Sequence, residues 1–209
     1  MNTVLVGFKR SPFTIANKGL LSKIRPEDIL SQVINDLIKT TNINKDDIED
    51  IIAGCAYPEG AQGYNIAKIV SFMTDMPEHV GGMTINRWCG SSMQAIHSAA
   101  GAISMNAGKV FICCGIESMT FVPINGLNYT PHPELLIDQP NVYLSMGLTA
   151  ENVAKKYNHS RKEQQDFAIL SHANAAKAQL SKSFDQELTI IKKDNIEVIS
   201  DGGIRPNTS

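Results

Sequence analysis

The sequence lacks several features that would assign a protein to a class at once. Its apolar runs are far shorter than the roughly 18 residues that a membrane-spanning helix needs, so we expect no membrane span. Basic residues are not in excess, because 19 Lys and Arg stand against 21 Asp and Glu, and nucleic-acid binding has no electrostatic support. The four cysteines show no framework spacing, and the first residues have no signal-peptide layout. These absences favour a cytoplasmic location.

Short strands and amphipathic helices alternate in the first part of the chain. With 209 residues, 43% of them hydrophobic, the chain is long enough for one or two globular domains. Parallel strands need crossover helices between them, so this alternation predicts an α/β fold made of β–α–β units. The predicted strands cover residues 3–7, 48–56, 83–85 and 110–114, and the predicted helices cover residues 26–38, 66–73 and 94–106.

The pattern changes after residue 119. Residues 120–145 contain Pro123, Pro131, Pro133 and Pro140 and show no regular periodicity. An irregular loop of this length is often functional. Two helices are predicted after it, at residues 149–157 and from a capping box at residues 160–163 to Ser181. One more strand is predicted at residues 188–191.

Cys89 has the setting of a reactive thiol. It lies between a short apolar run that ends at Ile85 and an alanine-rich helix, where the backbone N–H groups of the first helical turn favour a thiolate. Residues 90–92, Gly-Ser-Ser, leave room for an acyl group. We interpret Cys55, Cys113 and Cys114 as buried, unreactive cysteines.

No metal site is expected, because Cys113 and Cys114 are adjacent on a predicted strand and point to opposite faces. His97 is interpreted as a packed residue of the core helix. Asn65, Asn86 and Glu117 are interpreted as helix caps and turn anchors, without a direct catalytic role.

Four ordered motifs resemble the thiolase family of acyl-CoA acyltransferases. The nucleophile motif of that family is similar to residues 86–95, NRWCGSSMQA. The other motifs are residues 54–55, GC, followed by 62–68, QGYNIAK; residues 115–119, GIESM; and residues 145–152, SMGLTAEN. The chain is most similar to the N-terminal half of bacterial 3-ketoacyl-CoA thiolases, and the resemblance covers essentially all of it.

This resemblance implies a thiolase-like fold and a domain division. Residues 1–117 correspond to the N-terminal βαβαβαβ half, a layered mixed sheet with helices that lacks its last strand. Residues 118–209 correspond to a partial loop or lid domain. The C-terminal thiolase domain is expected to be absent, since thiolases are close to twice this length and their Gly-His-Pro motif, which carries the activating histidine, does not occur here.

The resemblance also implies an activity. The chain is expected to be part of an acyl-CoA C-acyltransferase of fatty-acid β-oxidation in which Cys89 forms an acyl thioester and its backbone N–H serves as an oxyanion donor. Ser145 and Met146 match the region that lines the pantetheine channel of CoA. The substrates are CoA and acyl-CoA with no further cofactor, and the family forms homodimers or dimer-based tetramers.

Three hypotheses remain open at this point. The chain is the N-terminal portion of a thiolase, either truncated or one subunit of a split enzyme that needs a chain supplying the C-terminal half. Alternatively, it is a non-catalytic remnant that acts through a partner chain, with the apolar face of helix 94–106 exposed. The third hypothesis is a condensing enzyme of fatty-acid synthesis, but Gln94 and residues 117–119 favour a thiolase.

Overall fold

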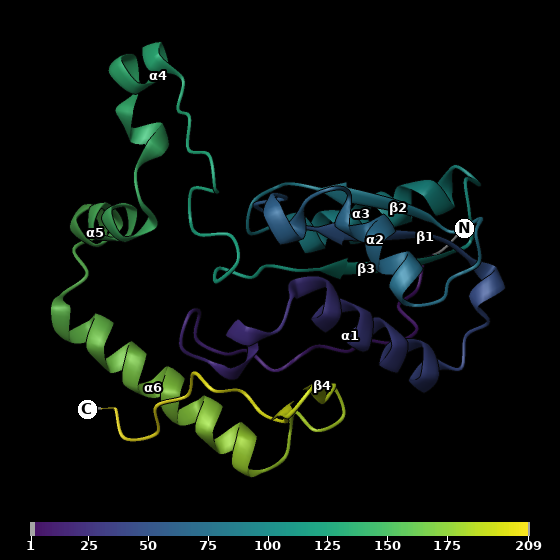
Figure 1. Ribbon diagram of the computed structural model, residues 1–209. Helices are drawn as coiled ribbons and strands as arrows, with labels where there is room; N and C mark the ends of the chain where they lie inside the picture. Colours follow the sequence, from purple (N-terminus) through teal and green to yellow (C-terminus); the bar gives the residue numbers. More distant parts are fainter. Residues whose placement is uncertain (1–2, 209) are drawn as a thin grey trace. The chain divides into compact units, whose positions relative to one another are not determined.

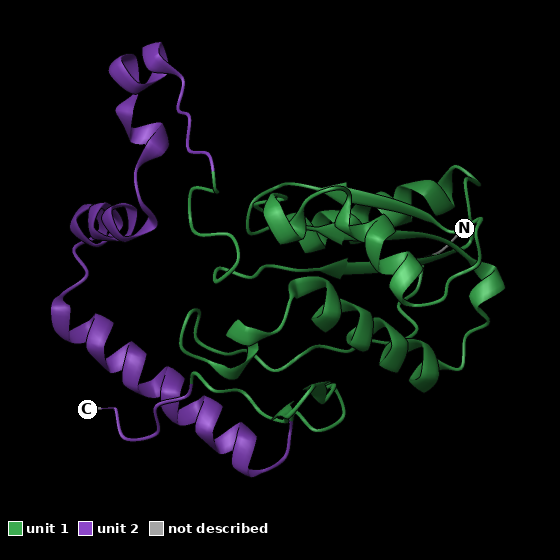
Figure 2. Ribbon diagram, viewed as in Figure 1, with its two compact units in different colours: residues 1–127, 184–203 green, residues 128–183, 204–209 purple. Residues whose placement is uncertain are grey.

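The computed structural model describes residues 3–208, which form two compact units (Figure 2). Unit 1 comprises residues 1–127 and 184–203, and unit 2 comprises residues 128–183 and 204–209. Unit 1 contains the sheets, whereas the elements of unit 2 are all helical.

Unit 1 is built on a parallel sheet of three strands with the order β2-β1-β3 (Figure 1). The strands are β1 (Ile48–Gly54), β2 (Gly81–Ile85) and β3 (Val110–Gly115), and both pairings are parallel. In the register, the last residues of all three strands lie side by side. The predicted α/β class is confirmed, and the carboxyl ends of the strands share one edge of the sheet.

Helices cover both faces of this sheet. One core joins the helices α1 (Pro26–Thr41) and α2 (Ile66–Met73) to Ile51 of β1, while α3 (Ser91–Ser104) packs its alanines on Ile52 from the other face. Neighbouring strand residues point to opposite faces, so this alternation follows from the period of the strand. Each fully buried Ile contributes about 1.5–3 kcal/mol to folding.

A hairpin and three short 3-10 helices complete unit 1. The hairpin pairs β4 (Ile191–Lys193) with β5 (Ile196–Val198) in antiparallel fashion. Ile191 is fully buried against Ile24 and Ile29. The 3-10 helices are η1 (Leu20–Lys23), η2 (Lys45–Asp47) and η3 (Gly60–Gln62).

Arg10 ties the beginning of unit 1 to its C-terminal segment. Its guanidinium donates to Glu187 Oε1 over 2.6 Å and to Asp201 over 2.8 and 3.0 Å. Burial by itself raises the pKa of Asp201, but the hydrogen bonds from Arg10 and from the Phe13 N–H outweigh it and hold that pKa below its usual value. The two segments, distant in sequence, are therefore joined by charge-assisted hydrogen bonds.

Unit 2 consists of α4 (Pro133–Asp138), η4 (Pro140–Tyr143), α5 (Met146–Tyr157) and α6 (Arg161–Leu180). The predicted capping box is present at the start of α6, where Ser160 and Glu163 exchange side-chain and backbone hydrogen bonds. In residues 120–145, the predicted irregular loop contains α4 and η4, both of which begin with a proline. Proline fits the first turn of a helix, so these prolines mark helix starts.

Two predicted strands differ from the structure. Residues 3–7 form no strand, and Val4, Leu5 and Val6 are exposed by 73%, 80% and 72%. Their apolar character predicted burial, but a strand also needs a paired neighbour, which local sequence cannot specify. Near residues 188–191, Leu188 makes only an isolated bridge with Arg10, and the regular strand begins at Ile191.

Among the helices of residues 3–208, none combines the length and the apolar character that crossing a membrane requires.

Candidate active site

Cys89 lies at the carboxyl edge of the parallel sheet. It follows β2, which ends at Ile85, and it precedes α3, which begins at Ser91. The residue is solvent-exposed. In open α/β sheets, ligands bind at this edge, where the loops after the strands converge. The geometry therefore presents this sulfur where a substrate can approach it.

The turn before Cys89 has an unusual backbone conformation. Trp88 has a φ of 50°, in the left-handed region that aromatic side chains rarely adopt. The Asn86 side chain accepts the Trp88 N–H over 2.9 Å. The Ser91 hydroxyl donates to the Trp88 carbonyl over 2.5 Å and accepts the Arg87 N–H over 2.8 Å. Side chains on both sides thus hold this turn.

The backbone N–H of Cys89 lies close to its own sulfur, just before the start of α3. The N-cap of α3 is Gly90, which supplies no side-chain cap. Within residues 3–208, the Cys89 N–H makes no hydrogen bond to another group. A free N–H beside a nucleophile is the type of donor that an oxyanion hole uses, and the predicted oxyanion role of this group stays a prediction.

Two glycines let the first turn of α3 approach the sheet. A Cβ on Gly54, the last residue of β1, would lie 2.4 Å from the Ser91 carbonyl carbon and 2.5 Å from the Ser92 nitrogen. A Cβ on Gly115, the last residue of β3, would lie 1.9 Å from Ser92 Oγ. The first turn of α3 therefore packs directly against the ends of β1 and β3. This contact determines the position of Cys89, which precedes α3, relative to the edge of the sheet.

The other three cysteines differ from Cys89. Cys55 is buried, and burial together with the Glu117 carboxylate raises the pKa of its thiol to about 12. Burial and the neighbouring Cys113 raise the pKa of Cys114 to about 12, and burial also raises the pKa of Cys113. A thiol with a raised pKa is a poor nucleophile. Only Cys89 among the four combines a free thiol with exposure.

Cys113 and Cys114 point to opposite faces of β3. The Cys113 thiol contacts the Ala95 carbonyl of α3, and the Cys114 thiol contacts the Ile52 carbonyl of β1. Within residues 3–208, no group of three or more His, Cys, Asp or Glu side chains is arranged to hold a metal ion.

Glu117, which is interpreted above as a turn anchor, belongs to a polar network next to the turn whose other member, Gln62, the sequence did not reveal. Glu117 accepts the Ala56 N–H over 2.7 Å and the Gln62 amide over 2.8 Å. Gln62 is fully buried, donates to the Tyr57 carbonyl over 2.9 Å and accepts the Ser118 N–H. The network joins the segment after β1 to the segment after β3. No local pattern could have shown it, because its members lie on separate loops.

Ser145 and Met146 lie in unit 2, whereas Cys89 lies in unit 1. Ser145 is the N-cap of α5, and its hydroxyl accepts the Leu148 N–H over 3.3 Å. Met146 is the first residue of that helix and is 72% exposed. A long apolar side chain with this exposure is available for contact with a ligand, and the predicted contact with CoA stays a prediction.

Comparison with known proteins assigns the family. The family model described as "Thiolase, N-terminal domain" matches residues 3–209. The chain belongs to the thiolase family. Its curated relatives include the 3-ketoacyl-CoA thiolases of Bacillus subtilis, 36% identical over 99% of this chain, and of Shewanella loihica, 35% identical over 99%.

Solved thiolase structures share the fold. The human mitochondrial 3-ketoacyl-CoA thiolase in complex with CoA matches 96% of this chain with a TM-score of 0.83 and 25% identity. The Bacillus anthracis acetyl-CoA acetyltransferase matches 99% with a TM-score of 0.82 and 27% identity. This chain spans 54–56% of the length of each of these four proteins. The thiolase-like fold of an N-terminal half is thus confirmed.

Two apolar side chains are exposed on the outer side of the thiolase helix α3. Ala95 and Ala99 are buried on the sheet, while Met93 and Ile96 are exposed by 55% and 38%. The apolar face of this helix is predicted to be exposed, but Ala95 and Ala99 pack on the sheet, and the exposed apolar side chains are the larger Met93 and Ile96. The prediction of a packed His97 is also wrong, since this residue is exposed. Helical spacing identified one buried stripe, and His97 lies outside it.

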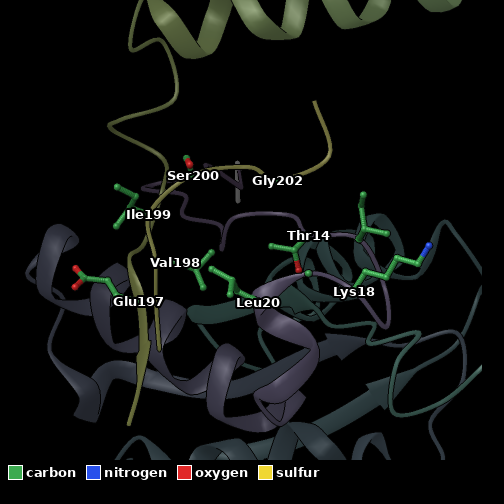
Figure 3. Close-up of a pocket in the computed structure, with 10 residues that line it drawn as sticks. Thr14, Lys18, Leu20, Glu197, Val198, Ile199, Ser200 and Gly202 are labelled. Carbon is green, nitrogen blue, oxygen red and sulfur yellow. The ribbon is translucent and has the colours of Figure 1, made fainter. Parts of the chain in front are cut away.

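One open cavity of about 370 Å³ lies elsewhere in unit 1 (Figure 3). It is lined by residues 14–15, 18–20, 197–200 and 202, and none of the site residues described above contributes to it. Its lining mixes apolar with polar and charged side chains, and Glu197 pairs with Lys192 over 3.0 Å. The cavity contains no cysteine and is separate from the candidate active site.

Proposed function

We propose that this thiolase chain is the N-terminal half of a 3-ketoacyl-CoA thiolase of fatty-acid β-oxidation and that Cys89 carries the acyl group. The observation that carries the proposal is the exposure of Cys89 at the β2–α3 junction, in contrast to the three cysteines whose thiols have a raised pKa. The names of the relatives support the substrate class.

The reaction divides into two acyl transfers. The Cys89 thiolate attacks the 3-keto carbon of a 3-ketoacyl-CoA, the bond between C2 and C3 breaks, and acetyl-CoA leaves after its C2 takes up a proton. The acyl group is then a thioester on Cys89. Free CoA gives up its thiol proton and attacks this thioester, which releases acyl-CoA and restores the thiolate. Exchange between thioesters is nearly isoenergetic, so sulfur suits the nucleophile.

A general base is needed to form the thiolate efficiently. The five histidines are His79, His97, His132, His159 and His172, and none of them lies in a Gly-His-Pro sequence. We propose that the base comes from a C-terminal half, supplied by another chain or by further sequence. In the assembled enzyme, a homo-oligomer, Ser145 and Met146 contact the pantetheine of CoA and the Cys89 N–H contributes to the oxyanion hole.

The second candidate is a non-catalytic remnant that acts through a partner chain. The exposed apolar side chains Met93 and Ile96 on the outer side of α3 favour a covering chain in either case. The two candidates differ in whether covering this face produces catalysis. Reconstitution with a complementary half separates them.

We expect thiolysis of acetoacetyl-CoA by CoA when the purified chain is mixed with the C-terminal half of the Bacillus subtilis relative. The positive control is the N-terminal half of that relative with the same partner, and the negative control is Cys89→Ala in this chain. The proposal is supported if the mixture with the wild-type chain forms acetyl-CoA and the mixture with Cys89→Ala does not. If the control pair is active and this chain with the partner is not, the remnant is the correct assignment.

A further inference from the structure

The left-handed conformation of Trp88 needs support from outside the residue. A bulky aromatic residue at a φ of 50° is strained, and such strain persists only where the surroundings determine it. Trp88 directly precedes Cys89, so any relaxation of its backbone moves the sulfur. The groups that hold Trp88 therefore also determine the direction in which the sulfur points.

Asn86 makes the hydrogen bonds that connect this turn to the sheet. Its side-chain oxygen accepts the Trp88 N–H over 2.9 Å, and its side-chain nitrogen donates to the Ala56 carbonyl over 2.8 Å. Ala56 lies just beyond the end of β1. A single amide thus links the strained residue to the neighbouring strand end, while Ser91 acts only within the turn.

The far end of this link is itself fixed. The N–H of Ala56 donates to Glu117 over 2.7 Å, and Glu117 is held by the fully buried Gln62 over 2.8 Å. The Tyr57 ring packs edge-on against the Trp88 ring, with 5.3 Å between the centroids. Ala56, whose carbonyl accepts the hydrogen bond from Asn86, is therefore anchored through its N–H to the segment after β3.

We propose that Asn86 is a positioning residue that holds the Trp88 turn against Ala56 and so fixes the Cys89 sulfur for acyl transfer. The expected effect on catalysis rests on the proposed function. The claim that Asn86 holds the Trp88 turn does not depend on that function and is tested separately. Small errors in the position of a reacting atom reduce rates steeply, up to about a hundredfold for about 1 Å. Loss of the Asn86 side chain should therefore affect the chemistry more than it affects folding.

Asn65 provides a matched control. Its side-chain nitrogen donates to the Gly82 carbonyl over 2.7 Å, and its side-chain oxygen accepts the Thr84 hydroxyl over 2.8 Å. Asn65 has a φ of 56°, so in Asn65→Ala an alanine must adopt this left-handed conformation, and the variant carries backbone strain in addition to the lost hydrogen bonds. Both asparagines are exposed and each makes a pair of hydrogen bonds, but those of Asn65 join the start of α2 to Gly82 and Thr84 of β2 and do not reach the turn before Cys89.

The experiment compares Asn86→Ala, Asn86→Asp and Asn65→Ala with the wild-type chain. Trp88 is the only tryptophan, so fluorescence anisotropy reports the order of this turn without any substrate. Transfer of an acetyl group from acetyl-CoA to Cys89, followed by mass spectrometry, reports the chemistry. Urea midpoints report stability. Asn86→Asp keeps an acceptor for the Trp88 N–H and removes the donor to Ala56.

For Asn86→Ala we expect lower Trp88 anisotropy and about a tenfold or greater fall in the acetyl-transfer rate. Asn86→Asp should also lower the anisotropy, because it loses the donor to Ala56 that holds the turn, whereas Asn65→Ala should leave the anisotropy unchanged and the acetyl-transfer rate within twofold of wild type while lowering the urea midpoint. Unchanged anisotropy in Asn86→Ala, or an equal loss of acetyl transfer in Asn65→Ala, overturns the inference. If the wild-type chain accepts no acetyl group, the proposed function fails, and the anisotropy still decides whether Asn86 holds the turn.

Discussion

Iodoacetamide is expected to modify Cys89 about a hundredfold faster than Cys55 or Cys114 at pH 8. The latter two thiols have a pKa of about 12. At pH 8, roughly one molecule in 10,000 then carries a thiolate at either position. Burial adds a steric barrier for Cys55, whereas Cys89 is open to solvent.

Peptide mapping by mass spectrometry at several labelling times measures these rates. In Cys89→Ala, the remaining cysteines should stay unlabelled until urea unfolds the chain. This control shows whether the folded chain still protects the buried thiols from iodoacetamide. Labelling of Cys55 or Cys114 at the rate of Cys89 in the folded chain would show that the thiols are equivalent. In that case, the contrast on which the site assignment depends would be lost.

Gly54→Ala is expected to destabilise unit 1 by about 2–4 kcal/mol. The added Cβ would overlap the backbone of Ser91 and Ser92, which cannot move without displacing the start of α3. Gly101→Ala is the matched control. It lies inside the same helix with open space around its Cβ position, so alanine should stabilise the helix by about 0.5–1 kcal/mol.

Urea unfolding followed by Trp88 fluorescence measures both variants. The two glycine-to-alanine changes should shift the midpoint in opposite directions. Gly54→Ala should also slow acetyl transfer to Cys89, because the helix start that seats the cysteine is moved. A stable Gly54→Ala chain with a wild-type midpoint would show that α3 does not lie as close to β1 as the structure places it.

Local patterns predicted most of the elements of unit 1. The helical spacing of apolar residues predicted α1, and the strand and helix flanking Cys89 were located from the run ending at Ile85 and the alanines after it. The capping box of Ser160 and Glu163 predicted the start of α6. These features depend on interactions within a few residues, which is why the sequence alone was sufficient.

Features that depend on distant partners could not be predicted from the sequence. Residues 3–7 have strand character but no strand partner among residues 3–208, and His97 lies on the side of α3 opposite the buried Ala95 and Ala99. The contact of Gly54 with the start of α3 depends on the packing of separate elements. The links from Asn86 and Glu117 to Ala56 depend on three loops that meet only in the folded sheet.

The mass of the Cys89 peptide after incubation with acetyl-CoA tests the central claim most directly. The account predicts a slow gain of one acetyl group at Cys89, absent in Cys89→Ala, and a faster gain when a complementary half supplies a base. No acetylation of the folded wild-type chain, or acetylation of Cys55 at a similar rate, would contradict the assignment of Cys89 as the acyl carrier.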